Sequence, residues 1–212
     1  MFRLLRWSLF LFLVVMCIGV AGYSMSYLLV DPNIHNPFVL RFAEAGFAVS
    51  FHFFFGAAAL LLVPFQASAR LRNRWTTAHR ALGGAYIGCV LLSGLSGLII
   101  AQGTHTGMGP RLGFSILSVL WLGFTARAVW ALIDKDIASH RRWMIRSMAL
   151  TASAITLRVI LGLGLGVFGF DFQAVYVFAA WGSWLINLAL IEVYLRWPTR
   201  LVLATKAQSM PS

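Results

Sequence analysis

Six long apolar runs dominate this sequence, and each approaches the length that an α-helix needs to cross a membrane. A hydrocarbon core of about 30 Å requires about 20 helical residues. The runs cover residues 7–30, 43–65, 79–101, 111–133, 143–168 and 172–197. They are continuous, whereas the strands of a membrane barrel alternate in polarity. We therefore predict an all-α integral membrane protein, a compact bundle of six transmembrane helices.

Composition supports a lipid bilayer as the surrounding medium. Of the 212 residues, 60% are hydrophobic and only 11% are charged, and the mean hydropathy is +0.82. A soluble domain of this size has too little interior to bury that much apolar surface. The connections between runs are short and no internal repeat is visible. We expect one transmembrane domain over residues 1–212, with a short cytoplasmic tail at 198–212.

The basic residues predict the orientation of the helices. Of 17 lysines and arginines, twelve fall on one side if the N-terminus is inside, two fall outside, and three lie within the runs. The inner residues are Arg3, Arg6, Arg70, Arg72, Arg74, Arg80, Lys135, Arg141, Arg142, Arg196, Arg200 and Lys206; the outer ones are Arg41 and Arg111. This asymmetry predicts cytoplasmic termini, and it explains the net charge of +11 without nucleic acid.

The first run also has features of a signal peptide. Arg3 and Arg6 precede it, and the small residues at 20–22 resemble a cleavage region. The apolar stretch is long for such a peptide and lacks a clean cleavage site at its end. We expect a retained membrane anchor.

Charged residues inside hydrocarbon are costly, so those present are informative. Arg127, Arg146 and Glu192 fall at a similar depth near the inner ends of the last three runs. Glu192 is therefore the expected counter-charge for one or both arginines. A structural ion pair is the simpler interpretation, and arginines that extend to the inner headgroups are the other.

Arg158 has a different setting. It lies about 22 Å along the fifth run, in the outer half of the membrane, with no acidic residue at its level. His52 lies about 13 Å deep from the same side, at a comparable level. Together they suggest a polar pocket for an anionic group such as a carboxylate. Alternatively, Arg158 bonds only backbone carbonyls or neighbours such as Thr156.

Four histidines form two candidate pairs. His79 opens the third run and His140 precedes the fifth, so both lie at the inner edge, whereas His52 and His105 lie towards the outside. Imidazoles on neighbouring helices can hold a haem iron from both faces. The arrangement resembles that of di-haem cytochromes b, although His105 falls about five residues outside its helix. Histidines at helix starts also occur in ordinary basic loops, and no HxxxH or CxxCH motif is present.

Two glycine pairs with GxxxG spacing predict close helix contacts. Gly84 and Gly88 form one pair in the third run, and Gly162 and Gly166 form the other in the fifth. Small residues at this spacing allow two membrane helices to approach closely.

Two segments carry a family resemblance. The segment from His140 to Thr151, continuing to Arg158, resembles the signature of a bacterial family of predicted membrane proteins catalogued as domain of unknown function 2306. Residues 64–66 and 79–83, with His52 upstream, also resemble its pattern, and the likeness covers about residues 45–165. It implies that the family's polar positions are His52, Gln66, His79, His140, Arg146 and Arg158. His105 is not among them, which weakens the two-haem arrangement, and the resemblance implies no particular activity.

Two hypotheses follow. In the first, the protein is a membrane electron carrier with haem b, linked to quinone or another membrane redox partner. His79 and His140 would be axial ligands, Arg146 would pair a haem propionate, and His52 with Arg158 would form an outer haem or quinone site. In the second, it is a non-catalytic membrane protein, either a small-solute transporter-like protein or an accessory subunit. The sequence leaves the oligomeric state open.

Overall fold

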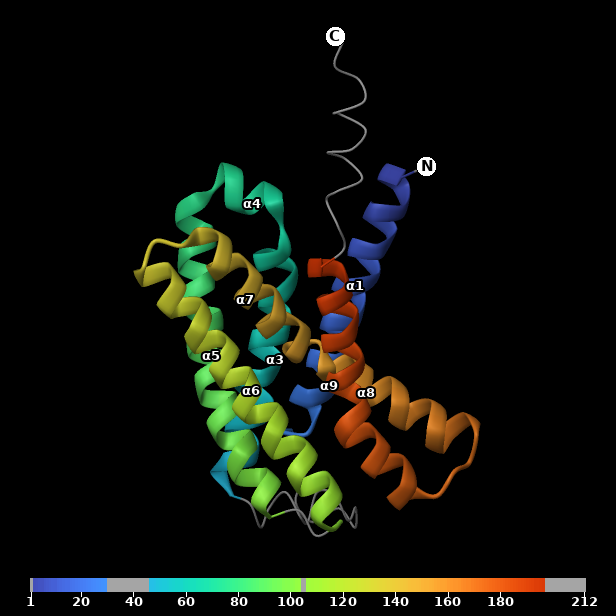
Figure 1. The fold of residues 1–212 in the computed structure, drawn as a ribbon. Coiled ribbons are helices and arrows are strands. Elements are labelled where there is room, and N and C mark those ends of the chain that lie inside the picture. The colour runs from blue at the N-terminus through green and yellow to red at the C-terminus, as the bar shows by residue number, and fades with distance from the viewer. Residues whose placement is uncertain (1, 30–45, 104–105, 197–212) are drawn as a thin grey trace.

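A computed structural model describes residues 2–29, 46–103 and 106–196. Within these ranges every regular element is helical, and six helices are long and apolar enough to cross a membrane. These spans are Trp7–Ser26, Phe47–Ala67, Thr76–Gln102, Met108–Ile133, Ile137–Val167 and Phe172–Arg196. The predicted all-α membrane fold is thereby confirmed (Figure 1).

The helix bounds differ from the predicted ones by a few residues at most ends. The elements are α1 (Phe2–Ser26), α3 (Phe47–Ala67), α4 (Ala69–Arg74), α5 (Thr76–Gln102), α6 (Met108–Ile133), α7 (Ile137–Thr151), α8 (Ser153–Leu161), the π-helix η1 (Gly162–Val167) and α9 (Phe172–Arg196). The short helix α4 was not predicted. His35, Arg41, His105 and the tail at 198–212 lie outside the described residues, as do the predicted span ends at 30, 43 and 197.

The fifth span departs most from its prediction, because it begins at Ile137 rather than 143 and is not one continuous helix. A break at Ala152 separates α7 from α8. On either side of it, the Ser153 hydroxyl donates to the Leu150 carbonyl (2.5 Å) and the Thr151 hydroxyl to the Ser147 carbonyl (3.1 Å). Such side-chain bonds to the preceding turn bend helices. The glycine-rich segment Gly162–Val167 then forms a π-helix.

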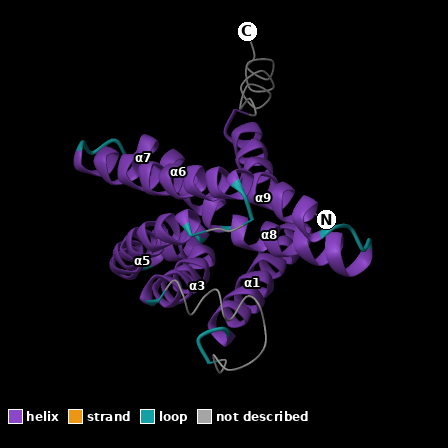
Figure 2. Ribbon diagram, turned by 90° about the horizontal axis from the view of Figure 1, so that it is seen from below, coloured by secondary structure: helices purple, strands orange, loops and turns teal. Residues whose placement is uncertain are grey.

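The helices α3, α5, α6 and α7 form the centre of the bundle, and α1 and α9 lie beside it. Of the helix pairs, α3 and α5 pack most extensively, and the two lie side by side when viewed along the bundle (Figure 2). α6 packs between α5 and α7, α1 covers α3, and α9 packs against α6, α7 and α8. The core contains Tyr86, Val90, Trp121, Ala128 and Leu150, all buried. Large apolar side chains remain exposed along every span, as a bilayer requires.

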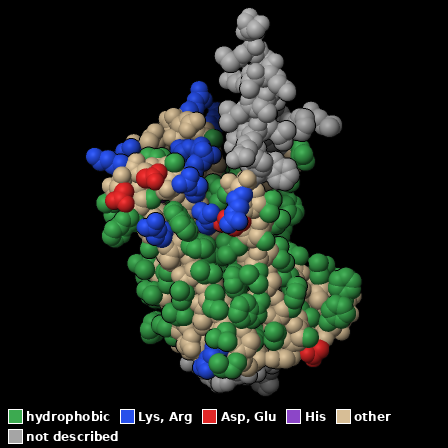
Figure 3. Space-filling model, in the orientation of Figure 1, with side chains coloured by type: hydrophobic (Ala, Val, Ile, Leu, Met, Phe, Trp, Pro, Cys, Tyr) green, Lys and Arg blue, Asp and Glu red, His purple; other side chains and the backbone are tan. Residues whose placement is uncertain are grey.

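Basic side chains gather at one end of the molecule. Figure 3 shows lysine and arginine side chains around the upper end, an apolar middle, and few basic groups below. α4, the connection between α6 and α7, and the end of α9 all lie there (Figure 1). We call this the basic end, and the positive-inside rule predicts that it faces the cytoplasm.

The GxxxG prediction was wrong. A Cβ added at Gly84, Gly88, Gly162 or Gly166 would have no neighbouring atom within 4 Å. The close approaches occur at other glycines. At Gly97 a Cβ would lie 2.8 Å from the His52 ring, and at Gly113 it would lie 2.9 Å from the Ala180 carbonyl oxygen on α9. The spacing alone did not reveal which face of each helix meets a neighbour.

Candidate functional site

His79 and His140 lie in the first turns of α5 and α7, at the basic end. The start of α7 is fixed by Asp136, whose carboxylate accepts from the backbone N–H of Ser139 at 2.9 Å. This bond holds the pKa of Asp136 below its usual value. The cap sets the first turn of the helix and therefore the position of His140.

The tautomer of His140 follows from its hydrogen bond. Its Nδ1 lies 2.8 Å from the backbone oxygen of Ala128 on α6. A carbonyl oxygen can only accept, so Nδ1 carries a proton; in the neutral imidazole the lone pair is then on Nε2. Histidines that bind metals are commonly oriented in this way, with one ring nitrogen donating to a carbonyl and the other facing the metal.

His79, at the same end of the bundle as His140, has an unsatisfied ring nitrogen. Its Nδ1 is buried and has no hydrogen-bond partner among the described residues. The ring interacts electrostatically with His140 and with Arg72. Its backbone is held by Gln66, whose Nε2 donates to the His79 carbonyl at 3.3 Å. We call His79, His140 and Gln66 the inner histidine site.

A buried hydrogen-bonded network, which the sequence analysis missed, lies deeper in the bundle than this site, farther from the basic end. The Tyr86 hydroxyl on α5 contacts the hydroxyls of Ser147 (2.9 Å) and Thr151 (2.6 Å) on α7. On α6, the Trp121 indole donates to Thr151 (3.0 Å) and Thr125 contacts Ser147 (2.7 Å). Every hydroxyl can donate one bond here, because the Thr125 and Thr151 hydroxyls also reach the Trp121 and Ser147 carbonyls.

The network lies about two helical turns from the inner histidine site, towards the middle of the bundle. Tyr86 follows His79 by seven residues and Ser147 follows His140 by seven, which is about 10.5 Å along each helix. The spacings 121/125 and 147/151 place each pair on one helix face. That spacing was the available signal for the network in the sequence.

His52, in the opposite half of the membrane, is part of a contact between α3 and α5. Its Nδ1 donates to the Ser93 carbonyl (2.9 Å), and the Ser93 hydroxyl donates back to the His52 carbonyl (3.1 Å). Gly97 lies against the ring, where any side chain would clash. Since Nδ1 donates, the lone pair of a neutral His52 ring is also on Nε2.

Arg158 on α8 bonds to α1 and to its own helix. It donates to the Ser24 hydroxyl (2.7 Å) and to the Ala154 carbonyl (2.9 Å), and its guanidinium lies 5.5 Å from the Tyr23 ring centroid. Its Nε is buried and without a partner, and it joins no ion pair in the described ranges. The charge of Arg158 acts on His52, but no direct hydrogen bond is found between them.

The predicted ion pair of Glu192 is confirmed for Arg146. The guanidinium binds both carboxylate oxygens, at 2.5 and 3.1 Å, and Arg196 contacts the same carboxylate at 3.3 Å. Arg127 instead lies over the Trp143 ring, 5.8 Å from its centroid. With Nε and Nη2 bound to Glu192, Arg146 is already neutralised within the chain.

A cofactor iron would need fewer protein ligands than a bare metal ion. In the part of the chain that the structure describes, no three His, Cys, Asp or Glu side chains come together as metal ligands. A b-type haem supplies four ring nitrogens itself and takes only axial ligands from the protein. The free Nε2 of His140 and the unsatisfied His79 ring fit that smaller requirement.

Comparison with protein families identifies the class. Residues 49–195 match the family described as "Predicted membrane protein (DUF2306)". The chain belongs to this family. The match confirms the resemblance found in the sequence and extends beyond the expected end at 165 to include α9 and Glu192. A search of curated proteins and a search of solved structures found no significant match.

Proposed function

We propose that this multi-pass membrane protein is an electron-transfer protein of the bacterial cytoplasmic membrane that binds haem b through His79 and His140. One observation carries the proposal: the Nδ1–H of His140 donates to the Ala128 carbonyl, which leaves Nε2 of the neutral ring available as a ligand, and a second imidazole, His79, lies in the first turn of α5 at the same end of the bundle. A haem held there would provide a one-electron carrier near the basic end.

The surrounding residues have distinct parts in this proposal. Ala128 and the Asp136 cap orient His140, and Gln66 holds the first turn of α5. Arg72, which interacts electrostatically with His79, is the basic group we assign to a propionate in place of Arg146. Arg146 stays with Glu192.

The buried network supports the inner histidine site from deeper in the bundle. Tyr86 and Ser147 join α5 to α7 directly, so the two histidine-bearing helices are tied at a fixed separation. The core around them is apolar, and Met144 on α7 is buried within it. Low polarity near a haem iron favours the less charged state and so tunes its reduction potential.

The test is the reduced-minus-oxidised spectrum of purified protein expressed with ample haem. We expect a b-type α-band in the wild type, and its loss in H79A and H140A. H52A is the matched control and keeps the band. A wild type without the band, or an H140A variant that retains it, overturns the proposal.

A cavity variant separates ligation from folding. In H140G, added imidazole can occupy the vacated space and restore the axial ligand. We expect the α-band to return with imidazole and to stay absent with a non-coordinating amine. A band in H140G that is independent of imidazole also contradicts the assignment.

Arg158 favours a second candidate, a polar site in the outer half for a small anion or a quinone carbonyl. The supporting observation is its buried Nε–H, which has no acceptor among the described residues. It would serve either a quinone partner of the haem protein or a transporter-like or accessory role. Quinone-dependent haem oxidation that is equal in R158Q and the wild type excludes the quinone role. Stabilisation of the wild type, but not R158Q, by small carboxylates supports the anion role.

A further inference from the structure

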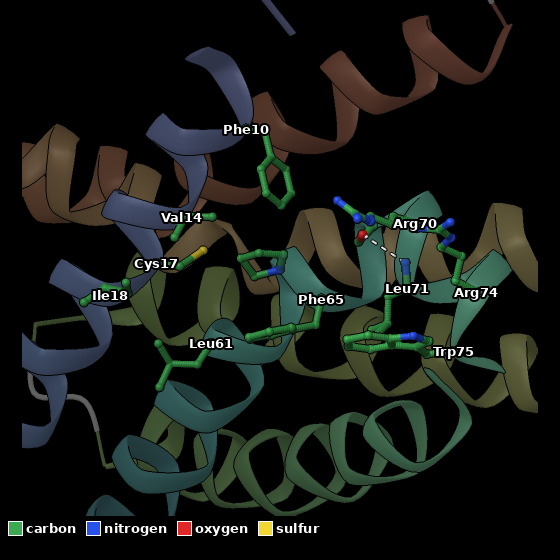
Figure 4. Close-up of a pocket in the computed structure, with 12 residues that line it drawn as sticks. Phe10, Val14, Cys17, Ile18, Leu61, Phe65, Arg70, Leu71, Arg74 and Trp75 are labelled. Carbon is green, nitrogen blue, oxygen red and sulfur yellow. Dashed lines mark hydrogen bonds between the residues drawn. The ribbon is translucent and has the colours of Figure 1, made fainter. Parts of the chain in front are cut away.

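A groove opens between α1, α3 and α4, apart from the inner histidine site. Its volume is about 900 Å³. Figure 4 shows its walls: Phe10, Val14 and Ile18 on α1 face Leu61 and Phe65 on α3. From Phe10 to Ile18 the apolar wall extends about 12 Å along the helix axis. This is a slot for an apolar chain that runs parallel to the spans.

The groove ends in positive charge at the basic end. Arg70 and Arg74 on α4 line it there, one helical turn apart and on one face (Figure 4). Both side chains are exposed, and neither takes part in an ion pair within the described ranges. Trp75 lies beside them, 69% exposed, as an interfacial tryptophan does.

The order of these groups matches one class of molecule. An apolar slot within the membrane leads to two guanidinium groups at headgroup depth, and guanidinium binds phosphate well. A neutral headgroup would leave both charges uncompensated, and free phosphate would leave the apolar walls unfilled. The charge and the polarity gradient therefore fit an amphiphile with an anionic head.

We propose that this groove binds an anionic phospholipid of the cytoplasmic leaflet. One acyl chain lies between α1 and α3, and the phosphate lies between Arg70 and Arg74. The lipid fills the space along the face where α1 covers α3. This site does not depend on haem or on the histidines.

Native mass spectrometry of the full chain tests the proposal. The protein, in a mild detergent, is titrated with phosphatidylglycerol or with phosphatidylcholine of the same acyl chains. We expect retention of one phosphatidylglycerol. Each basic residue near an anionic headgroup strengthens binding about fivefold, so R70Q/R74Q should weaken it about 25-fold.

Matched variants separate the groove from the general basic surface. R141Q/R142Q removes two exposed charges at the same end but outside the groove, and should change binding by less than about twofold. V14W fills the groove, whereas V15W places the same bulk on the adjacent, exposed face of α1. We expect V14W to lose the lipid and V15W to retain it.

Three outcomes overturn the proposal. These are equal retention of the two phospholipids, equal loss in R70Q/R74Q and R141Q/R142Q, and retention in V14W at the wild-type level. Thermal melts of every variant establish that the folded protein is compared.

Discussion

His140 in the inner histidine site and His52 in the outer region make the same kind of hydrogen bond in different surroundings. In both, a histidine donates Nδ1–H to a carbonyl of a neighbouring helix. His52 is part of a reciprocal contact with Ser93, and Gly97 packs against its ring. His140 instead shares the basic end with a second imidazole, His79, whose Nδ1 has no partner among the described residues. The comparison indicates that a candidate pair of ligands is recognised by the unsatisfied ring nitrogen of the second histidine, and not by the hydrogen bond of the first histidine alone.

The arginines of the two regions differ in the same way. Near the basic end, Arg146 is bound by Glu192 and stacked at 4.7 Å on the Trp143 ring. In the outer half, Arg158 has only neutral partners in the described ranges and keeps one donor unused. Among the described residues, Nδ1 of His79 in the inner region thus has no hydrogen-bond partner, and Nε–H of Arg158 in the outer region has no acceptor.

The largest expected effect on stability comes from Gly97. A leucine there would push into the His52 ring, since even a Cβ lies 2.8 Å from it. We expect G97L to lower the free energy of unfolding by about 3 kcal/mol through overpacking of α3 against α5. Unfolding in a denaturing detergent measures this. G84L is the control, because Gly84 faces open space; equal losses in both variants would remove the role given to His52.

Removal of the Tyr86 hydroxyl tests the buried hydrogen-bonded network next to the inner histidine site. Y86F leaves the buried Thr151 oxygen with one donor fewer and deprives Ser147 of one partner. We expect a loss of about 1–2 kcal/mol in the free energy of unfolding, with the haem α-band retained. T156V, which removes a single bond to Asn187 elsewhere, should cost less. Absence of any cost in Y86F contradicts the network.

Substitution of the two arginines sharpens their contrast. R146M removes the bidentate partner of Glu192, whereas R158M removes a partly buried cation that has no carboxylate partner in the described ranges. We expect R146M to lower the free energy of unfolding by about 1 kcal/mol. We expect R158M to lower it by less, because removal of a partly buried charge offsets the lost hydrogen bonds. The same unfolding measurement ranks the two. A larger loss in R158M points to a counter-charge elsewhere in the protein.

Loss of the Asp136 cap, by acid or by substitution, is expected to have the smallest effect on the stability of the protein. The pKa of Asp136 is lowered in the folded protein, so its contribution is present above the unfolded pKa and is lost as pH falls through the folded value. We expect acid to lower the protection of the Ser139 amide in the first turn of α7 of the wild type, measured as its hydrogen-exchange rate relative to the intrinsic rate at the same pH. D136N should exchange faster at neutral pH and show less dependence on pH. Identical pH profiles would exclude the cap as a determinant of His140 position.

The sequence predicted those features that depend on position along a single helix. Apolar run length gave six spans, and equal depth from the basic end related Glu192 to Arg146. The network of Tyr86 and Ser147, and the bond from Arg158 to Ser24, depend on how each helix is rotated about its axis. Rotation also decided which glycines meet a neighbour. Nearly uniform hydrophobicity around α5, α6 and α9 conceals that rotation, so the spacing of polar residues in the sequence indicated shared helix faces without showing which neighbour each face meets.

The haem-to-protein ratio of the purified protein tests the central claim most directly. It is measured by pyridine haemochromogen absorbance in wild type, H52A, H79A and H140A after expression with ample haem. The inner histidine site predicts about one haem per chain in wild type and H52A, and almost none in H79A and H140A. A wild type without haem, or equal ratios in all four proteins, would contradict it.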